Sequence, residues 1–394
     1  MKKYCLHALA ITTVILSHTG GTIAQQPKKE STYPLIPYPS SLSPGKGNFL
    51  LTKKTVLLKQ DNAPTFLNEQ HFLQQMLFNC LGDSLSTART TSGQTYIQLK
   101  YDPAISGSES YKLNITPNAI TLSAKNGAGM FYALETLRQL MPATMENTRL
   151  EKLTIPSVTI ADHPAFAWRG MHLDISRHFF GPAYLRKYVD MMALYKLNKL
   201  HLHLTDDQGW RIEIKKYPLL TETGAWRRFE KHDSICIKTF QTTGNKDFEI
   251  DKRYIKEKDG QPLYGGYYTQ DEMKDFIAYA ASRHIEVIPE IDMPGHMEAA
   301  SRAYPWLTCD STRNTGPGFS TPICPPNEDV IEFSKNILTE IAALFPSKYI
   351  HIGGDEVNTG NWERSSVSKA FMQAKGMNKL NCRPTSTSAS SSIL

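Results

Sequence analysis

Residues 198–211, with the sequence NKLHLHLTDDQGWR, combine a strand pattern with a run of ionisable side chains. The regular alternation from Lys199 to Leu204 predicts a strand. Asp206 and Asp207 follow directly after the strand ends. In open parallel sheets and in barrels, ligands bind at the carboxyl ends of the strands. This stretch therefore predicts an α/β fold whose functional site collects polar side chains from successive strand ends.

Three more stretches of the chain repeat this arrangement. We expect strands over residues 167–174, 286–289 and 349–353, and each of them runs into polar and ionisable residues. Helical patterns separate the strands, over residues 182–196, 269–283 and 327–345. Strands that alternate with helices predict a parallel sheet, so the four polar strand ends should converge on one site.

The strand ends carry an unusual number of carboxylates, namely Asp206, Asp207, Glu290, Asp292, Asp355 and Glu356. Like charges in one small cavity cannot all stay ionised, so we expect some of these groups to have raised pKa values. A carboxylic acid with a raised pKa can protonate a leaving oxygen near neutral pH, which favours glycoside cleavage. Nearby aromatic residues that could stack on sugar rings are Trp168, Trp210, Trp226 and Tyr268.

A second chemistry uses the same part of the chain. His201 and His203 lie on one face of the expected strand, and with Asp206, His296 and Asp355 they could form the metal site of a metal-dependent TIM-barrel amidohydrolase. Such barrels carry their His-x-His pair on the first strand, whereas this pair is on the second. Histidines that face a barrel interior are also often hydrogen-bonded core residues. Sensitivity to a chelator separates the two alternatives.

The part of the chain before these strands has a different pattern. Short alternating strands are expected over residues 96–101, 110–115 and 119–124, followed by a helix over residues 130–141. Few catalytic residue types gather there. We therefore expect an N-terminal α+β accessory domain over residues 27–160 and a catalytic domain over residues 161–380.

Composition and charge limit the classes of molecule that the chain is expected to bind. The chain has 394 residues, of which 40% are hydrophobic, so it can bury a large core. Its formal net charge is +6, but the basic residues are scattered, which argues against nucleic acid as the main partner.

The first 26 residues have the pattern of a secretory signal peptide. Lys2 and Lys3 precede an apolar run from Leu6 to Leu16, and Thr22-Ile23-Ala24 is a plausible cleavage site. No later stretch is long or apolar enough to span a membrane. We therefore expect an exported protein, periplasmic or extracellular, with no membrane span in the mature chain.

Export permits disulfide bonds. Cys309 and Cys324 flank a loop rich in Gly, Pro, Thr and Ser, and they either form a local disulfide or remain two buried thiols. No Cys-x-x-Cys pair or Cys/His cluster has zinc-site spacing, so we expect no structural metal.

Four motifs in this order resemble glycoside hydrolase family 20, the β-N-acetylhexosaminidases. They are RGMHLDISRHF at 169–179, NKLHLHLTDDQGWR at 198–211, EIDMPGH at 290–296 and HIGGDE at 351–356. The resemblance covers residues 33–362. It implies an accessory α/β domain followed by a (β/α)8 TIM-type barrel, and removal of terminal β-linked GlcNAc or GalNAc from oligosaccharides or glycoconjugates without a cofactor.

The resemblance also implies roles for individual residues. Glu356 is the expected general acid and base, while Asp355 holds the acetamido N–H of a substrate that assists its own hydrolysis. Asp206 and His296 are expected to orient the acid. Arg169 is expected to bind sugar hydroxyls. Two further residues, His203 and Asp207, are expected near the substrate, although Asp207 could equally brace the loop backbone.

The resemblance stops after the fourth strand. Only 41 residues follow Gly353, so we expect that about four of the eight barrel units are present and that the chain alone has weak activity or none. Residues 381–394 read as an aberrant Ser/Thr-rich tail. Codons for this tail can encode an amphipathic helix in another frame, so a frameshift after about Leu380 is our hypothesis. A degenerate protein that binds glycans without turnover is the remaining alternative.

Overall fold

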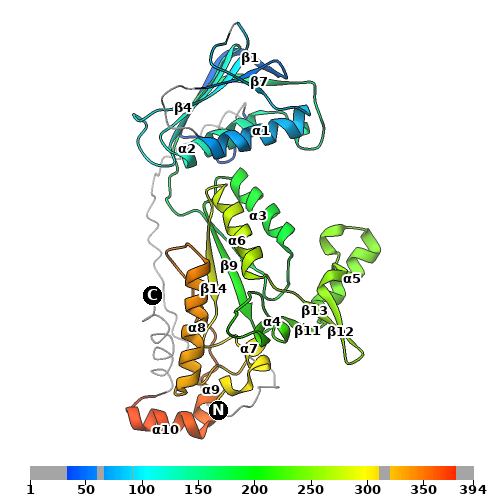
Figure 1. Ribbon diagram of the computed structural model, residues 1–394, viewed down its shortest axis with the longest axis vertical. Helices are drawn as coiled ribbons and strands as arrows, with labels where there is room; N and C mark the ends of the chain where they lie inside the picture. Colours follow the sequence, from blue (N-terminus) through cyan, green and yellow to red (C-terminus); the bar gives the residue numbers. More distant parts are fainter. Residues whose placement is uncertain (1–32, 60–65, 92, 310–319, 379–394) are drawn as a thin grey trace, which may run out of the picture. The chain divides into compact units, whose positions relative to one another are not determined.

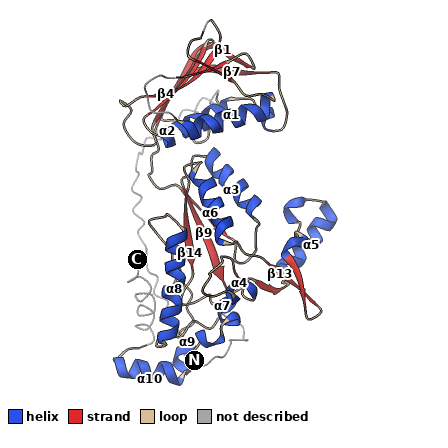
Figure 2. Ribbon diagram, in the orientation of Figure 1, coloured by secondary structure: helices blue, strands red, loops and turns tan. Residues whose placement is uncertain are grey.

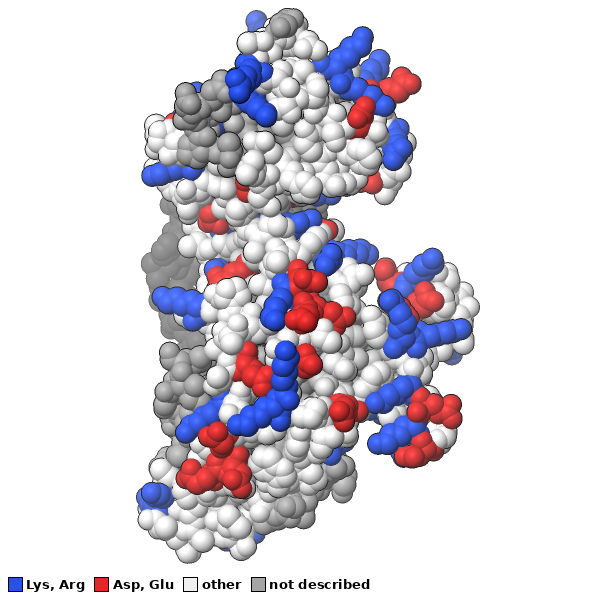
Figure 3. Space-filling model, in the orientation of Figure 1, with Lys and Arg blue, Asp and Glu red and all other residues white. Residues whose placement is uncertain are grey.

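A computed structural model of the chain describes residues 33–59, 66–91, 93–309 and 320–378. The expected signal peptide and the expected tail at 381–394 lie outside the described residues. Among the described helices, none has both the length and the apolar character needed to cross a membrane. On the face drawn in Figure 3, basic and acidic side chains are interspersed.

A seven-stranded sheet forms the first folded part (Figure 1). Its strands are β1 (Ser41–Thr52), β2 (Val56–Leu58), β3 (Ser86–Ala88), β4 (Tyr96–Tyr101), β5 (Tyr111–Ile115), β6 (Ala119–Ala124) and β7 (Lys152–Asp162). They are arranged in the order β1-β7-β5-β6-β4-β2-β3. β4 pairs in parallel with β2 and β6, while β5 and β7 pair antiparallel, so the sheet is mixed.

Two helices cover one face of this sheet, α1 (Leu67–Leu81) and α2 (Gly127–Leu140) (Figure 2). α2 is buried along most of its length and packs against β5, β6 and α1. Its close approach to β5 depends on Gly129, where a Cβ atom would sit 2.3 Å from the Ser110 carbonyl oxygen. The expected α+β character of this region and its strands at 96–101 and 119–124 match the observed elements.

The second part contains three parallel strands, β8 (Gly170–Asp174), β9 (Lys199–Asp206) and β14 (Glu286–Ile291). β9 is central and pairs with β8 on one side and β14 on the other. The helices that connect or follow these strands are α3 (Pro182–Leu194), α6 (Gln270–Ala281) and α8 (Glu328–Leu344). α6 begins with a capping box formed by Thr269 and Glu272. The parallel register places the ends of β8, β9 and β14 at one edge.

The expected fourth strand at 349–353 is not a full strand. The segment runs alongside β14 and exchanges backbone hydrogen bonds with it, but only one isolated parallel bridge forms, between Glu290 and His351. The extended conformation ends because Gly353 and Gly354 adopt positive φ angles of 62° and 94° and turn the chain. This turn places the residues that follow beside the ends of β9 and β14.

A long insertion follows β9. It contains β10 (Gly209–Trp210), α4 (Leu219–Glu222), β11 (Trp226–Arg228), α5 (Lys231–Thr243), β12 (Ile255–Lys258) and β13 (Gln261–Gly265). Arg211 fixes its base. This side chain is fully buried, and its guanidinium donates hydrogen bonds to the carbonyl oxygens of Ser176, Ala225 and Gly266 at 2.6–3.2 Å. One cation thus joins three separate backbone segments.

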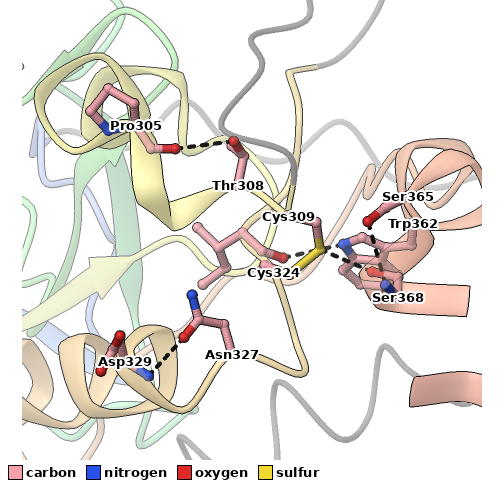
Figure 4. The surroundings of a disulfide bond; sticks show 10 residues. Pro305, Thr308, Cys309, Cys324, Asn327, Asp329, Trp362, Ser365 and Ser368 are labelled. Carbon is pink, nitrogen blue, oxygen red and sulfur yellow. Dashed lines mark hydrogen bonds between the residues drawn. A yellow bond between two sulfur atoms is a disulfide. The ribbon is translucent and has the colours of Figure 1, made fainter. Parts of the chain in front are cut away.

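Cys309 and Cys324 form a disulfide bond (Figure 4). It lies between α7 (Glu298–Ala303) and α8, and it contacts the pair of helices α9 (Gly360–Arg364) and α10 (Ser366–Lys375). Cys309 Sγ is 2.9 Å from Ser368 Oγ, and the Trp362 indole N–H donates to the Ile323 carbonyl. The bond therefore fastens the described chain on both sides of residues 310–319 against the last two helices.

We predict that Arg211→Lys destabilises the protein by about 2–3 kcal/mol, because one ammonium cannot satisfy three divergent buried carbonyl groups. Urea denaturation of wild type and variant measures this loss. The matched control is Arg228→Lys, whose side chain is exposed. Equal stability of the wild type and Arg211→Lys would contradict the structural role assigned to the guanidinium.

Candidate active site

The ends of β9 and β14 and the turn after 349–353 bring five ionisable side chains together. These side chains are Asp206, Asp292, His296, Asp355 and Glu356. His296 follows the cis peptide bond between Met293 and Pro294, and both His296 and Glu356 have positive φ angles. Such backbone conformations are uncommon for residues with side chains and cluster at functional sites.

A short relay links Asp206 to Glu356. Asp206 Oδ1 is 3.2 Å from His296 Nδ1, and His296 Nε2 is 3.4 Å from Glu356 Oε2. The Asp206 and His296 side chains are buried, whereas the Glu356 side chain is 51% exposed. The arrangement therefore presents one carboxylate to solvent and supports it from behind with an imidazole and a second carboxylate.

The relay continues inward through His203 and Glu290. His203 Nε2 lies 3.0 Å from Asp206 Oδ2, and His203 Nδ1 lies 2.6 Å from Glu290 Oε2. Carboxylates and imidazoles thus alternate over five residues, from Glu290 in β14 to Glu356 after the turn. His203 is only 5% exposed, so the structure places it behind Asp206 and not at the surface of the site, where a substrate-binding residue was expected.

The charges of this network are strongly coupled. Hydrogen bonds that His296 donates to the carboxylates of Asp206 and Asp207 outweigh burial and raise the pKa of His296 to about 11. Burial lowers the pKa of His203, but Asp206 and Glu290 outweigh it and raise this pKa to about 9. Burial likewise raises the pKa of Asp206, but the two imidazoles and Arg177 hold it well below its ordinary value. Both histidines are therefore cationic at neutral pH and Asp206 is ionised.

Asp292 is the carboxyl group of the site whose pKa is raised, whereas that of Asp206 is lowered. Burial, with the nearby charge of Asp355, raises its pKa to about 7, against the effect of the Gly354 N–H and His296. Its Oδ1 accepts a hydrogen bond from the Gly354 N–H at 3.1 Å. A Cβ atom at Gly353 would sit 1.9 Å from the same oxygen, so a glycine is required there. Asp292 therefore holds the turn that carries Asp355 and Glu356.

Asp207 braces the neighbouring loop. Its Oδ1 accepts a hydrogen bond from the backbone N–H of Glu298 at the start of α7, and its Oδ2 is 3.4 Å from His296 Nδ1. Its backbone carbonyl accepts a hydrogen bond from Arg302. Of the two roles open from the sequence, these contacts match the support of the loop backbone.

Arg169 does not lie with the other candidate residues. Its guanidinium forms an ion pair with Glu109 at 2.8 Å and donates to the carbonyl oxygens of Phe166 and Lys196. It lies before β8, at the opposite end of the strand from the site. The position expected for Arg169 is therefore corrected.

Arg177 is the arginine at the site, and sequence reasoning missed it. It follows β8, its guanidinium is 2.6 Å from Asp206 Oδ2 and 2.9 Å from Asp174 Oδ2, and its side chain is 44% exposed. The available signal was its place after the strand, since each other candidate also lies after a strand end.

The candidate sugar-stacking aromatics are mostly structural. Trp210 and Tyr268 are buried, with exposed fractions of 0% and 1%. Trp226 packs against the Lys256 ammonium. Trp168 is 54% exposed, but it packs against Lys199 and Tyr349 near the amino ends of the strands. None of the four lies beside Glu356 in the contacts of the described residues.

The residues of the alternative metal site are divided among several clusters. His203 groups with Asp206 and Asp292, while His296 groups either with the two aspartates 206 and 207 or with Asp292 and Asp355. His201 shares none of these groups and lies beside His172 and Glu290. No one of these groups contains all five of the expected ligands, because His201 lies apart from the other four. The donor set does not fit an amidohydrolase metal centre.

Two family models match the chain. The model described as "Glycosyl hydrolase family 20, catalytic domain" matches residues 166–387, and "Glycosyl hydrolase family 20, domain 2" matches residues 32–163. A beta-hexosaminidase of Porphyromonas gingivalis is 39% identical over 68% of this chain and 32% of its own length. A beta-hexosaminidase of Vibrio furnissii is 33% identical over 94% of this chain and 56% of its own.

Solved structures give the same result. A GH20 exo-β-N-acetylglucosaminidase from Vibrio harveyi, in complex with N-acetylglucosamine, superposes with a TM-score of 0.73 at 32% identity, over 91% of this chain and 53% of the other. A mutant Streptomyces plicatus beta-hexosaminidase in complex with its product GlcNAc gives 0.68 at 35% identity, over 86% and 62%. This chain thus spans from about a third to somewhat over half of these relatives' lengths.

We predict that Asp292→Asn changes the pH dependence of stability. The folded-state pKa of about 7 exceeds the ordinary 3.8, so the wild type loses stability as pH rises between these values, whereas Asn cannot ionise. The stability of Asp292→Asn relative to wild type should therefore rise by about 2 kcal/mol from pH 5 to pH 8.

Urea denaturation at the two pH values measures this change. Asp275→Asn, at an exposed position of α6, is the control and should show no such pH dependence. A relative stability of Asp292→Asn that is the same at pH 5 and pH 8 would show that Asp292 is ionised in the fold.

Proposed function

The chain belongs to glycosyl hydrolase family 20, and on this premise we propose that it acts as an exo-β-N-acetylhexosaminidase. The substrates are oligosaccharides or glycoconjugates that end in a non-reducing β-linked GlcNAc or GalNAc. The observation that carries the proposal is the exposed Glu356 carboxylate, 3.4 Å from the buried His296 and adjacent in sequence to Asp355. The N-acetylglucosamine complexes of the similar structures support the same substrate class.

We propose substrate-assisted retention as the reaction. In the first step, the carboxyl group of Glu356 donates its proton to the glycosidic oxygen as the bond from that oxygen to C1 breaks. The carbonyl oxygen of the substrate's 2-acetamido group attacks C1 from the other face and forms a cyclic oxazolinium ion. Asp355 accepts a hydrogen bond from the acetamido N–H and stabilises the positive charge that spreads onto that group.

The second step reverses the proton's path. The Glu356 carboxylate now removes a proton from water as the water oxygen attacks C1, and the C1–O bond of the oxazolinium ring breaks. Two inversions at C1 give overall retention. Adjacent carboxylates therefore have different tasks, because Glu356 must cycle its proton while Asp355 stays charged.

The buried relay has a defined electrostatic role in both steps. The His296 cation stabilises the Glu356 carboxylate that remains after proton donation, since the two groups are 3.4 Å apart. Asp206 and Asp207 lie 3.2 Å and 3.4 Å from His296 Nδ1, so their negative charges offset the charge of the imidazolium.

Arg177 is our candidate for binding the hydroxyl groups of the sugar. Its partly exposed guanidinium has five N–H donors, and Asp174 and Asp206 use only some of them. This role replaces the one that the sequence suggested for Arg169.

We also propose that the protein is exported to the periplasm or the medium. The support is the pattern of residues 1–26 and the disulfide bond between Cys309 and Cys324, which persists in oxidising compartments. Intact-mass measurement of protein from the exported fraction should give a chain that begins near residue 25, with two fewer hydrogens than the reduced form. A chain that keeps Met1 in the cytoplasmic fraction would contradict export.

We predict that Glu356→Gln lowers turnover of 4-nitrophenyl N-acetyl-β-glucosaminide by about 10²–10⁴-fold, because the amide neither donates nor accepts the proton. The loss should be larger for diacetylchitobiose, whose leaving alcohol needs protonation more than nitrophenolate does. Asp355→Asn should lower turnover by about 10²-fold or more. Rates with both substrates, measured by absorbance and by sugar release, provide the test.

Three controls sharpen this experiment. Glu257→Gln, at an exposed position of β12, should keep full activity. The 4-nitrophenyl β-glucoside, which lacks the acetamido group, should be a poor substrate. A chelator should leave activity unchanged. Equal losses on both leaving groups would contradict acid catalysis by Glu356, and GlcNAc binding without turnover would favour a glycan-binding protein.

A further inference from the structure

A second cluster of histidines surrounds Glu290 outside the catalytic relay. His172 comes from β8, His201 from β9 and His351 from the segment beside β14, which carries Glu290 itself. The rings of His172 and His201 are 4.7 Å apart, and so are those of His201 and His351. Parallel register brings these residues together, since His172 pairs with His201 and Glu290 bridges to His351.

The nitrogen atoms of this cluster point at one carboxylate. Glu290 Oε2 is 2.9 Å from His201 Nε2 and 3.6 Å from His172 Nε2. Glu290 Oε1 is 2.8 Å from His351 Nδ1. His203 Nδ1 is 2.6 Å from Oε2 as well, so three ring nitrogens surround a single oxygen atom.

Hydrogen bonding alone does not account for this arrangement. A carboxylate oxygen has two in-plane lone pairs, and His203 already occupies one of them. Among the described residues, His201 Nε2 is buried and has no well-oriented hydrogen-bond partner. His351 Nδ1 accepts a hydrogen bond from the Gly353 N–H, so it cannot at the same time donate a proton to Glu290. The Nε2 atoms of His172 and His201 therefore face the same carboxylate oxygen, Glu290 Oε2, from two neighbouring strands.

We propose that His172, His201 and Glu290 bind a zinc ion, with a solvent molecule as the fourth ligand. Imidazole and carboxylate in this ratio are the ligands of tetrahedral zinc sites. Zinc–ligand bonds of about 2.0–2.1 Å put neighbouring ligand atoms about 3.3–3.4 Å apart. The distances of 2.9 Å and 3.6 Å from Glu290 Oε2 to the two histidines lie on either side of that spacing.

The cluster also has what a metal site needs around it. A cavity of about 540 Å³ is lined by His172, His201 and His351, so an ion can reach all three rings. The side chains of His172 and His351 are about half exposed, whereas Glu290 is 6% exposed. His203 donates to Glu290 from the opposite, buried side, as outer hydrogen-bond partners of metal-bound carboxylates do.

The site adjoins the proposed catalytic relay, because it shares Glu290 with it. It uses none of Asp206, His296, Asp355 or Glu356, and the zinc ion would cross-link β8, β9 and β14. The spacing of the cysteines could not reveal it, because all three protein ligands are histidine or glutamate. Zinc binding should therefore stabilise the fold whether or not the chain hydrolyses glycosides.

Titration of the metal-free full-length chain with Zn²⁺ tests the proposal. Calorimetry should show one site per chain, and the melting temperature should rise with zinc. Co²⁺ in place of zinc should give the intense visible absorption of a tetrahedral site. His172→Ala and His201→Ala should each weaken binding by at least 10-fold, whereas His232→Ala, at an exposed position of α5, should not change it.

Circular dichroism of each variant without metal shows whether it is folded, and His172→Ala should be the safest because His172 is half exposed. Zinc binding that is equally strong in wild type and in folded His172→Ala would overturn the site. Absence of zinc binding at millimolar concentration would overturn it as well. Neither result depends on glycosidase activity, so failure here is distinguishable from failure of the proposed function.

Discussion

The alternation of carboxylates and imidazoles from Glu290 to Glu356 is the interaction on which the rest of the site depends. Each imidazolium is held between two anions, so neither the cations nor the buried Asp206 is left without a partner of opposite charge. An uncompensated buried charge would be strongly destabilising. The last member, Glu356, is the one that reaches solvent. The network thus ends in one solvent-exposed carboxylate at the edge of the sheet, and the buried ion pairs behind it support that carboxylate.

The backbone conformation positions the members of this ion network. Parallel pairing of β9 with β14 sets His203 opposite Glu290, and the tight turn at Gly353 and Gly354 then directs Asp355 and Glu356 toward His296. Asp292 occupies the space that a side chain at Gly353 would need, and it accepts the hydrogen bond of the Gly354 N–H. Glu356 itself has a positive φ angle of 49°. These uncommon backbone angles allow Asp355 and Glu356, although adjacent in sequence, to contact different parts of one substrate.

Much of the fold and of the candidate site could be predicted from the sequence alone. The features that could not be predicted depend on tertiary packing and strand register. The alternation in NKLHLHL and the helical pattern over 269–283 predicted β9 and α6, because both signals are local. The 349–353 segment also alternates, yet its glycines end the extended conformation. Arg169 and Arg177 are eight residues apart on one motif, and β8 begins at Gly170, later than the predicted strand at 167–174, so Arg169 precedes the strand and Arg177 follows it. Trp210 has a side chain that could stack on a sugar but is buried, and burial depends on tertiary packing that no local pattern contains. The cluster at Glu290 needs the register of three strands, which no local pattern contains.

The most direct test of the network is the protonation state of its two histidines. In nitrogen-15 spectra of the folded protein, His203 and His296 should both be imidazolium at pH 7, with titration midpoints near 9 and 11, because ionised carboxylates flank each ring. Single His→Gln variants assign the two signals. A midpoint near 6.5 for either ring would contradict the alternating ion chain and, with it, the support that Glu356 is proposed to receive.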